Sequence, residues 1–387
     1  MEVNWEEIRE QQFPALKRII SLKAAGGSPL SRSAYNSGLK YLNDMLNYGD
    51  IFWDDFFIEL NTIREKIAQY FNAKPTEIAF FINTSSCMNT IARLIKPGEI
   101  LYPEDEFPSS IHIFKRLGFK NTKIKHVNHQ YPIEHITNQI TNNTNYIIHS
   151  HVQYSTGYKQ NLEKLGDLCK KNNIISIINA TQSFGAFPID VDKCNIDILV
   201  TSALKWACCG YGIGILFIKE KIINEIDLPF SSWLSVKDAF SMDNENINIK
   251  QETSAMDCLG GTPHFSALFT LKGGLNLIEI IGSGDLQEGL RRISKRILWL
   301  TSEFLNEIKK LNYKIITPIE LEYRSGIITL EHNRAEDIFK ELLKNNIHIS
   351  LRSNPKSLEK TFLRFSFNYY NNFEDISKSI SILKIFD

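Results

Sequence analysis

A lysine at the end of an apolar run is the residue of this sequence best suited to chemistry. Lys205 closes the β-type run 197–205, and the small-residue stretch 207–214 follows it. Burial of an ammonium group is costly and lowers its pKa, and a neutral amine can condense with a carbonyl group. A lysine whose head group reaches back to water shows the same pattern, so Lys205 alone leaves both interpretations open.

A second apolar run ends in amide and hydroxyl side chains. The segment 174–185 reads as a buried strand that carries Asn179 and Gln182 at its carboxyl end. Two adjacent strands that deliver a lysine and an amide cluster to one edge of a sheet predict a cofactor pocket there.

Two more segments carry groups suited to a charged, flat molecule. Thr84, Ser85 and Ser86 close an expected strand and open a helix, where backbone N–H groups and the helix dipole favour an anion such as phosphate. Phe107 follows the next strand, and its ring could cover a flat cofactor. Each signal is weak alone, because most Ser/Thr caps bind nothing and a phenylalanine is more often part of the core.

Composition limits the classes of function. The chain has 387 residues, is 43% hydrophobic and 23% charged, and has a formal net charge of zero. This length predicts one large domain plus a smaller one, and the neutral balance argues against nucleic acid or an anionic membrane as the main partner. The N-terminal residues show no targeting pattern, and the six cysteines show neither disulfide nor zinc spacing. We therefore expect a cytoplasmic protein.

Strand and helix patterns alternate over the first two thirds of the chain. We expect strands at 78–82, 99–102, 146–149, 174–178, 197–201 and 213–218, and helices at 56–71, 84–95, 109–117 and 162–171. This alternation predicts an α/β fold with a mostly parallel sheet flanked by helices. The Asn- and Lys-rich stretches 121–145 and 243–250 are interpreted as surface loops.

The pattern changes after residue 263 to that of a compact α+β lobe. It comprises expected helices at 265–281, 286–309, 335–344 and 373–383, and strands at 327–330 and 362–366. We expect an N-terminal segment, 1–25, that packs with the small domain. A large cofactor-binding domain, 26–265, and a small C-terminal domain, 266–387, complete the expected organisation.

Together the motifs resemble the class V aminotransferase family of fold type I pyridoxal-phosphate (PLP) enzymes. This family includes cysteine desulfurases, kynureninases and isopenicillin N epimerase-like proteins. The resemblance begins at residue 13 and extends into the C-terminal lobe, and the order and separation of the motifs agree with the family. The most specific segments are 83–89, 151–157, 179–185, 202–206, 261–263 and 363–366.

The resemblance implies a role in cofactor binding for several residues. Lys205 would form the internal aldimine with PLP and later move the substrate's Cα proton. Phe107 would stack on the pyridine ring, and Gln182 would contact the ring hydroxyl. The phosphate would be held by Thr84, Ser85 and Ser202, with Ser86 close by.

The resemblance also implies a substrate and a partner. Arg364 would bind the carboxylate of an α-amino acid, since a guanidinium can hold a carboxylate with two parallel hydrogen bonds. Arg352 is a second candidate for substrate contact. Thr262 would reach the phosphate of the neighbouring subunit's cofactor, so a homodimer is implied.

Asn179 departs from the family, which has an aspartate paired with the pyridine nitrogen. An opposite charge at contact shifts a pKa by roughly 1–3 units, on the order of 1.4–4 kcal/mol. An amide would leave the ring a weaker electron sink, so we expect a lyase, epimerase or elimination reaction in preference to transamination. An ordinary aminotransferase that tolerates Asn179, and a catalytically silent homologue that serves as a binding subunit, are the alternatives.

Other departures argue against a persulfide-forming cysteine desulfurase. Leu204 stands where desulfurases have a histidine, and no cysteine follows Cys258, so the segment 351–355 offers no thiol. Cys208 and Cys209 are interpreted as small residues in a tight turn. No metal site is expected, because the histidines of the segment 126–135 lack further ligands.

Overall fold

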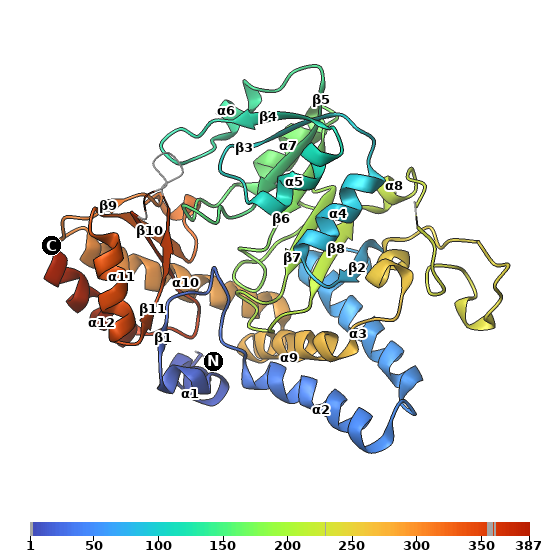
Figure 1. Ribbon diagram of the computed structural model, residues 1–387, viewed down its shortest axis with the longest axis horizontal. Helices are drawn as coiled ribbons and strands as arrows, with labels where there is room; N and C mark the ends of the chain where they lie inside the picture. The colour runs from blue at the N-terminus through green and yellow to red at the C-terminus, as the bar shows by residue number, and fades with distance from the viewer. Residues whose placement is uncertain (1–2, 229, 354–358, 360) are drawn as a thin grey trace.

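The chain folds into two domains, each built on its own sheet (Figure 1). The structure is a computed structural model that describes residues 3–228, 230–353, 359 and 361–387. A seven-stranded sheet forms the large domain, and a four-stranded sheet forms the small one.

The large sheet has the strand order β2-β8-β7-β6-β5-β3-β4. Its strands are β2 (Ile78–Phe81), β3 (Glu99–Pro103), β4 (Lys120–Ile124), β5 (Thr144–Ser150), β6 (Ile175–Asn179), β7 (Ile198–Ser202) and β8 (Gly214–Ile218). Strands β4, β3, β5, β6 and β7 are parallel, whereas β8 runs antiparallel between β7 and β2. The expectation of a mostly parallel sheet is confirmed.

Strand β4 lies within a stretch that we expected to be loop. It is an edge strand with a largely polar composition, and only Ile124 is buried. Charged side chains are common on edge strands, where they discourage pairing with another chain. A short helix, α6 (Ile133–Thr137), follows in the same stretch, so the loop interpretation of 121–145 was wrong in part. The stretch 243–250 contains no helix and only an isolated bridge at Ile249.

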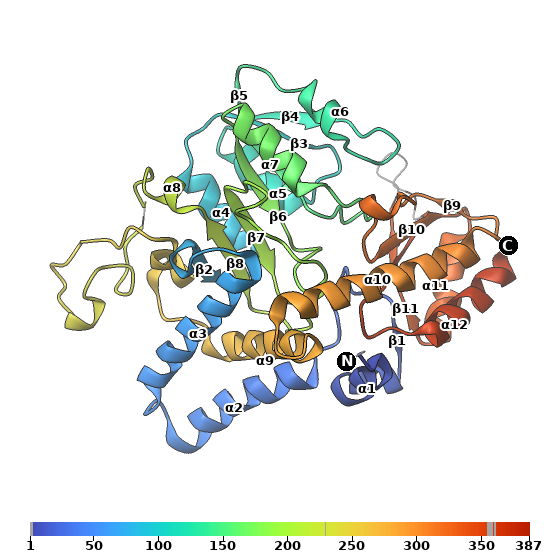
Figure 2. The same ribbon diagram turned by 180° about the vertical axis from the view of Figure 1, so that it is seen from behind.

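Helices cover both faces of the large sheet (Figures 1 and 2). Alternate strand residues point to opposite faces, so Ile178 joins one core and Ile177 the other. One face packs against α4 (Thr84–Leu94), α5 (Pro108–Arg116) and α8 (Glu220–Ile223). The other packs against α3 (Trp53–Phe71), α7 (Leu162–Lys171), α9 (Phe265–Ile281) and the first half of α10 (Leu286–Ile308).

The small domain has its own core. Its antiparallel sheet has the order β12-β13-β10-β9. The elements are β9 (Lys314–Ile315), β10 (Ile327–Glu331), β12 (Ser350–Arg352), β13 (Phe362–Ser366), α11 (Ala335–Lys344) and α12 (Phe373–Leu383). The second half of α10 completes this core through Leu300 and Phe304. Helix α9, expected in the small domain, packs in the core of the large domain instead.

Within the described residues, no single helix is both long and apolar enough to cross a membrane. Helices α9 and α10 meet the length and composition criteria only when they are taken together, as one segment with a 78° bend.

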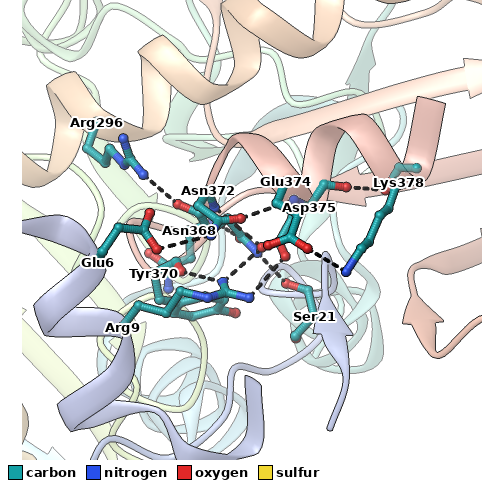
Figure 3. A network of polar contacts seen from close by, with 12 residues as sticks. Glu6, Arg9, Ser21, Arg296, Asn368, Tyr370, Asn372, Glu374, Asp375 and Lys378 are labelled. Carbon is teal, nitrogen blue, oxygen red and sulfur yellow. Dashed lines mark hydrogen bonds and ion pairs between the residues drawn. The ribbon is translucent and has the colours of Figure 1, made fainter. Parts of the chain in front are cut away.

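Residues 5–48 connect the two domains. Strand β1 (Ile20–Ser21) pairs in parallel with β11 (Ile347–His348), and α2 (Arg32–Tyr48) packs against α9. Helix α1 (Trp5–Gln12) carries Arg9, which forms two hydrogen bonds with the carboxylate of Asp375 at the start of α12 (Figure 3). Asn368 donates a hydrogen bond over 3.2 Å to the carbonyl of Trp206, the residue that follows Lys205.

Replacing Arg9 by alanine should destabilise the fold by about 3–5 kcal/mol, because it leaves the buried carboxylate of Asp375 without its cation. The Asp375 side chain is only 2% exposed. Chemical denaturation of the two proteins measures the difference. Lys40→Ala is the control, because Lys40 forms an exposed pair with Asp44 and its loss should cost about 0–1 kcal/mol. Equal losses for the two variants would contradict the prediction.

Candidate active site

A cavity of about 310 Å³ opens where the parallel strands of the large sheet end. Ser150, Asn179 and Ser202 are the last residues of β5, β6 and β7, and all three line it. Neighbouring parallel strands carry their carboxyl ends to one edge, which is where open α/β sheets bind ligands. The other lining residues are Ala25, Gly26, Asn83, Thr84, Ser85, Phe107, Ser109, Tyr154, Thr181, Gln182, Leu204, Lys205, Arg352 and Arg364.

Lys205 brings its amine into this cavity. It follows β7, and its Nζ lies 5.8 Å from the centre of the Phe107 ring. Burial lowers the pKa of Lys205 to about 7, with smaller contributions from the positive charges of Arg364 and Arg352. The amine makes no hydrogen bond or ion pair with the residues that the structure describes. A large fraction of it is therefore neutral and nucleophilic near pH 7.

One side of the cavity is suited to an anion. Helix α4 begins there, with Asn83 rather than a hydroxyl residue as its N-cap, and Thr84 and Ser85 supply its first turn. The hydroxyl of Ser202 is buried and has no hydrogen-bond partner among the described residues. The free N–H groups of a helix N-terminus and an unpaired hydroxyl can bind phosphate oxygens. Ser86 does not line the cavity, because its N–H and hydroxyl donate to Asn83.

Two buried amides form the floor of the cavity. Asn179 accepts a hydrogen bond from the Thr181 N–H over 3.0 Å and donates to the hydroxyl of Ser110 over 2.9 Å. Gln182 accepts from the indole N–H of Trp206 and donates to the carbonyl of Ala25, each over 3.0 Å. Both amides are therefore fixed in orientation before any ligand binds.

A buried guanidinium forms the wall toward the small domain. Arg364, on β13, is 1% exposed and donates to the carbonyl of Tyr154 over 2.7 Å and to the hydroxyl of Ser350. Its Nε has no partner, and no carboxylate of the described residues lies within ion-pair distance. Burial, with a smaller effect from Arg352, lowers the pKa of Arg364 to about 9. Arg352 is an exposed residue that lines the same cavity.

Most of the residues expected in the site therefore lie around one cavity, and two do not. Thr262 is exposed and lies outside the cavity, as does Ser86. None of the described residues between 228 and 262 lines the cavity. Asn354 and Pro355, in the segment considered for a thiol, lie outside the described residues.

Sequence reasoning missed the residues behind Asn179. Glu106 and Ser110 are buried and reach Asn179 through hydrogen bonds. The available signal was an acidic residue directly before Phe107, at the carboxyl end of a strand, where an unpaired carboxylate is unusual.

Comparison with known proteins identifies the family. The profile of the family described as Aminotransferase class-V matches residues 47–378. A kynureninase of Bacillus cereus (strain ATCC 10987 / NRS 248) is 25% identical over 415 residues, covering 98% of this chain and 91% of the kynureninase.

Two solved structures share the fold. The apo structure of the cysteine desulfurase from Thermococcus onnurineus NA1 has a TM-score of 0.88 and 20% identity, and covers 100% of this chain and 98% of that chain. A mutant of C-DES with glycine covalently linked to its PLP cofactor has a TM-score of 0.86 and 16% identity, covering 97% and 98%.

The chain belongs to the class V aminotransferase family, and it has the fold of the fold type I PLP enzymes. Its cofactor is pyridoxal 5'-phosphate. The cavity fits that group, because it combines a free amine, a helix N-terminus for the phosphate and the unpaired hydroxyl of Ser202.

Proposed function

We propose that the chain acts on an α-amino acid through PLP held at Lys205, and that it catalyses a lyase, epimerase or elimination reaction in preference to transamination. The proposal rests on one observation: Lys205, Asn179 and Arg364 line the same cavity. They offer an amine with a pKa of about 7, an amide where the family has an acid, and a buried guanidinium.

The residues around the amine are suited to holding the cofactor. When bound, PLP supplies an aldehyde that takes up amines and a ring that withdraws electrons from the substrate's Cα. Thr84, Ser85 and Ser202 hold its phosphate, and Phe107, which is 41% exposed, covers its ring. The Gln182 amide donates one hydrogen bond to Ala25, and its second N–H would bind the ring hydroxyl. The Lys205 amine would move the substrate's Cα proton.

Arg364 selects the substrate. Its guanidinium lines the cavity and its Nε has no partner among the described residues, so it is available for a carboxylate, and the surrounding burial strengthens such a pair. Arg352 provides a second cation at the exposed side of the cavity. An α-amino acid meets both requirements, since it joins an amine for the cofactor to a carboxylate for the arginine.

A persulfide-forming desulfurase reaction is not part of this proposal. The sequence has no cysteine after Cys258, so the small domain carries no thiol to take up sulfur. Cys208 and Cys209 follow Lys205 but are buried, and burial raises the pKa of the Cys208 thiol to about 12. These two thiols are therefore poor nucleophiles.

The proposed assembly is a homodimer in which Thr262 reaches the partner subunit's cofactor. The exposure of Thr262, away from the cavity of its own subunit, agrees with such a role. Sedimentation of the unaltered protein, together with the PLP affinity of Thr262→Ala, tests both parts of this proposal.

Changing Asn179 to Asp should raise the pKa of the bound cofactor's ring nitrogen by about 1–3 units, because a carboxylate favours the protonated nitrogen. Transamination should become faster for the same reason. A pH titration of the cofactor's absorbance measures the shift. Asn161→Asp is the control, since it adds the same charge at the N-cap of α7, where aspartate is equally favourable. An unchanged titration in Asn179→Asp would mean that position 179 does not lie beside the ring.

A screen of amino acids against the PLP-loaded protein tests the reaction itself. A change in the cofactor's absorbance identifies a substrate, and mass spectrometry identifies its products. Amino-group transfer to a keto acid at ordinary turnover would establish the aminotransferase alternative. A colourless protein that ignores added PLP would establish the binding-subunit alternative.

A further inference from the structure

Glu106 is a buried carboxylate without a cation partner in the part of the chain that the structure describes. It lies between β3 and α5, directly before Phe107, and is 7% exposed. The N–H groups of Phe107 and Ser150 each donate to one of its oxygens over 2.8 Å. The Ser150 hydroxyl donates over 2.6 Å, and the Gln153 amide approaches to 3.4 Å. A backbone N–H group can only donate, and an ionised carboxylate can only accept. The two N–H groups therefore favour the ionised form of Glu106.

A hydroxyl links this carboxylate to Asn179. The Ser110 hydroxyl, itself fully buried, donates to Glu106 over 3.2 Å, so its oxygen is left to accept the Asn179 Nδ2–H over 2.9 Å. On its other side, the Oδ1 of Asn179 accepts the Thr181 N–H. Two hydrogen bonds in series therefore connect the amide to the carboxylate: Asn179 donates to Ser110, and Ser110 donates to Glu106. In addition, Ser150 and Asn179 are partners in the register of β5 and β6.

We propose that Glu106 is a positioning residue for the cofactor's ring nitrogen: acting through Ser110, it holds the amide of Asn179 and supplies the negative charge that position 179 lacks. The inference rests on the proposed function, in which Asn179 lies beside the ring. In the family the carboxylate is paired with the ring nitrogen directly. Here the carboxylate of Glu106 would act on the nitrogen through the Ser110 hydroxyl and the Asn179 amide.

A second carboxylate at position 179 would not ionise independently of Glu106. In Asn179→Asp, the new carboxylate and Glu106 would compete for the one hydroxyl proton of Ser110, and two carboxylates that share a site do not both ionise readily. Burial already raises the pKa of Glu106, and the nearby charge of Asp105 acts in the same direction. We therefore expect Glu106 to take up a proton in part of the molecules of this variant, so the ring nitrogen's pKa should rise by an amount near the low end of the roughly 1–3 units given above.

The test uses the protein loaded with PLP that carries ¹⁵N at the ring nitrogen, in the absence of amino acids. The ¹⁵N chemical shift, followed over pH, reports the protonation of that nitrogen. Glu106→Gln should lower the ring nitrogen's pKa, by less than the roughly 1–3 units that a charge at contact produces, because two hydrogen bonds separate the carboxylate from the amide. Ser110→Ala should shift it in the same direction by less, and it carries the test if Glu106→Gln does not fold. Glu99→Gln is the control. Glu99 is also a buried acid, but it is the first residue of β3, at the end away from Glu106, so its replacement should leave the ring nitrogen's pKa unchanged.

A double-mutant cycle tests whether Glu106 supplies the negative charge that position 179 lacks. Asn179→Asp should raise the ring nitrogen's pKa more in the Glu106→Gln background than in the unaltered protein. A purely structural Glu106 would lower the melting temperature and leave the titration unchanged. Unchanged titrations in both Glu106→Gln and Ser110→Ala, with PLP still bound, would overturn the inference. Whether PLP attaches to Lys205 at all tests the proposed function separately.

Discussion

Replacing Lys205 by alanine is expected to abolish covalent attachment of PLP and to lower turnover by roughly 10²–10⁴-fold, the usual contribution of a positioned proton-transfer group. The reason is that the Lys205 amine lines the cavity with its pKa lowered to about 7. Borohydride reduction of the loaded protein, digestion and mass spectrometry measure the attachment. In the unaltered protein the label should appear on the peptide that contains 203–206.

Lys159→Ala is the matched control for this experiment. Lys159 is also partly buried, and burial likewise lowers its pKa, but its Nζ lies over the ring of Phe187, outside the cavity. We expect this variant to retain the label and most of the activity. Label on any peptide other than the one containing Lys205 would contradict the assignment of the reactive amine.

The strands that carry the site were predictable because their sequences are continuously apolar and end in polar residues. Strand β6 was expected at 174–178 and is found at Ile175–Asn179, and β7 was expected at 197–201 and is found at Ile198–Ser202. Both are buried along their whole length or nearly so, which is typical of a parallel sheet with helices on both faces. The edge strand β4 escaped prediction because its residues are polar, so no apolar run marks it.

The hydrogen-bond chain behind Asn179 could not be predicted from the sequence. Glu106 and Ser110 lie four residues apart across the start of α5, and Asn179 belongs to a different strand, 69 residues beyond Ser110. Such a contact depends on the position of α5 over the sheet, which local patterns do not specify. The domain boundary was expected at residue 265, before α9, because the helical pattern of α9 does not show which core it joins; its packing shows that it joins the core of the large domain.

The cationic side chains that line the cavity favour anionic ligands. Lys205, Arg352 and Arg364 lie close enough for the arginines to lower the pKa of Lys205 and for Arg352 to lower that of Arg364. Three cationic groups at one site repel one another until anions bind between them. A phosphate at α4 and a carboxylate at Arg364 would each relieve part of this repulsion, so the cavity favours ligands that carry negative charge.

Replacing Arg364 by alanine is accordingly expected to weaken amino-acid binding by roughly 30-fold or more. Truncating one partner of a buried charged pair costs about 2–5 kcal/mol, and about 1.4 kcal/mol corresponds to a factor of ten. Titration of the PLP-loaded protein with its amino-acid substrate, followed by the cofactor's absorbance, measures the affinity. PLP itself should remain bound, because the residues proposed to hold its phosphate, at the start of α4 and at Ser202, do not include Arg364.

Arg324→Ala separates loss of a substrate contact from loss of packing. Arg324 is also a buried arginine with an unpaired Nε, and it donates to the Ser302 hydroxyl over 2.9 Å, but it does not line the cavity. If buried arginines matter only for the fold, both variants should lose stability and both should keep their substrate affinity. If Arg364→Ala loses affinity and Arg324→Ala does not, the Arg364 guanidinium contacts the substrate. Of these two arginines, only Arg364 lines the cavity with Lys205.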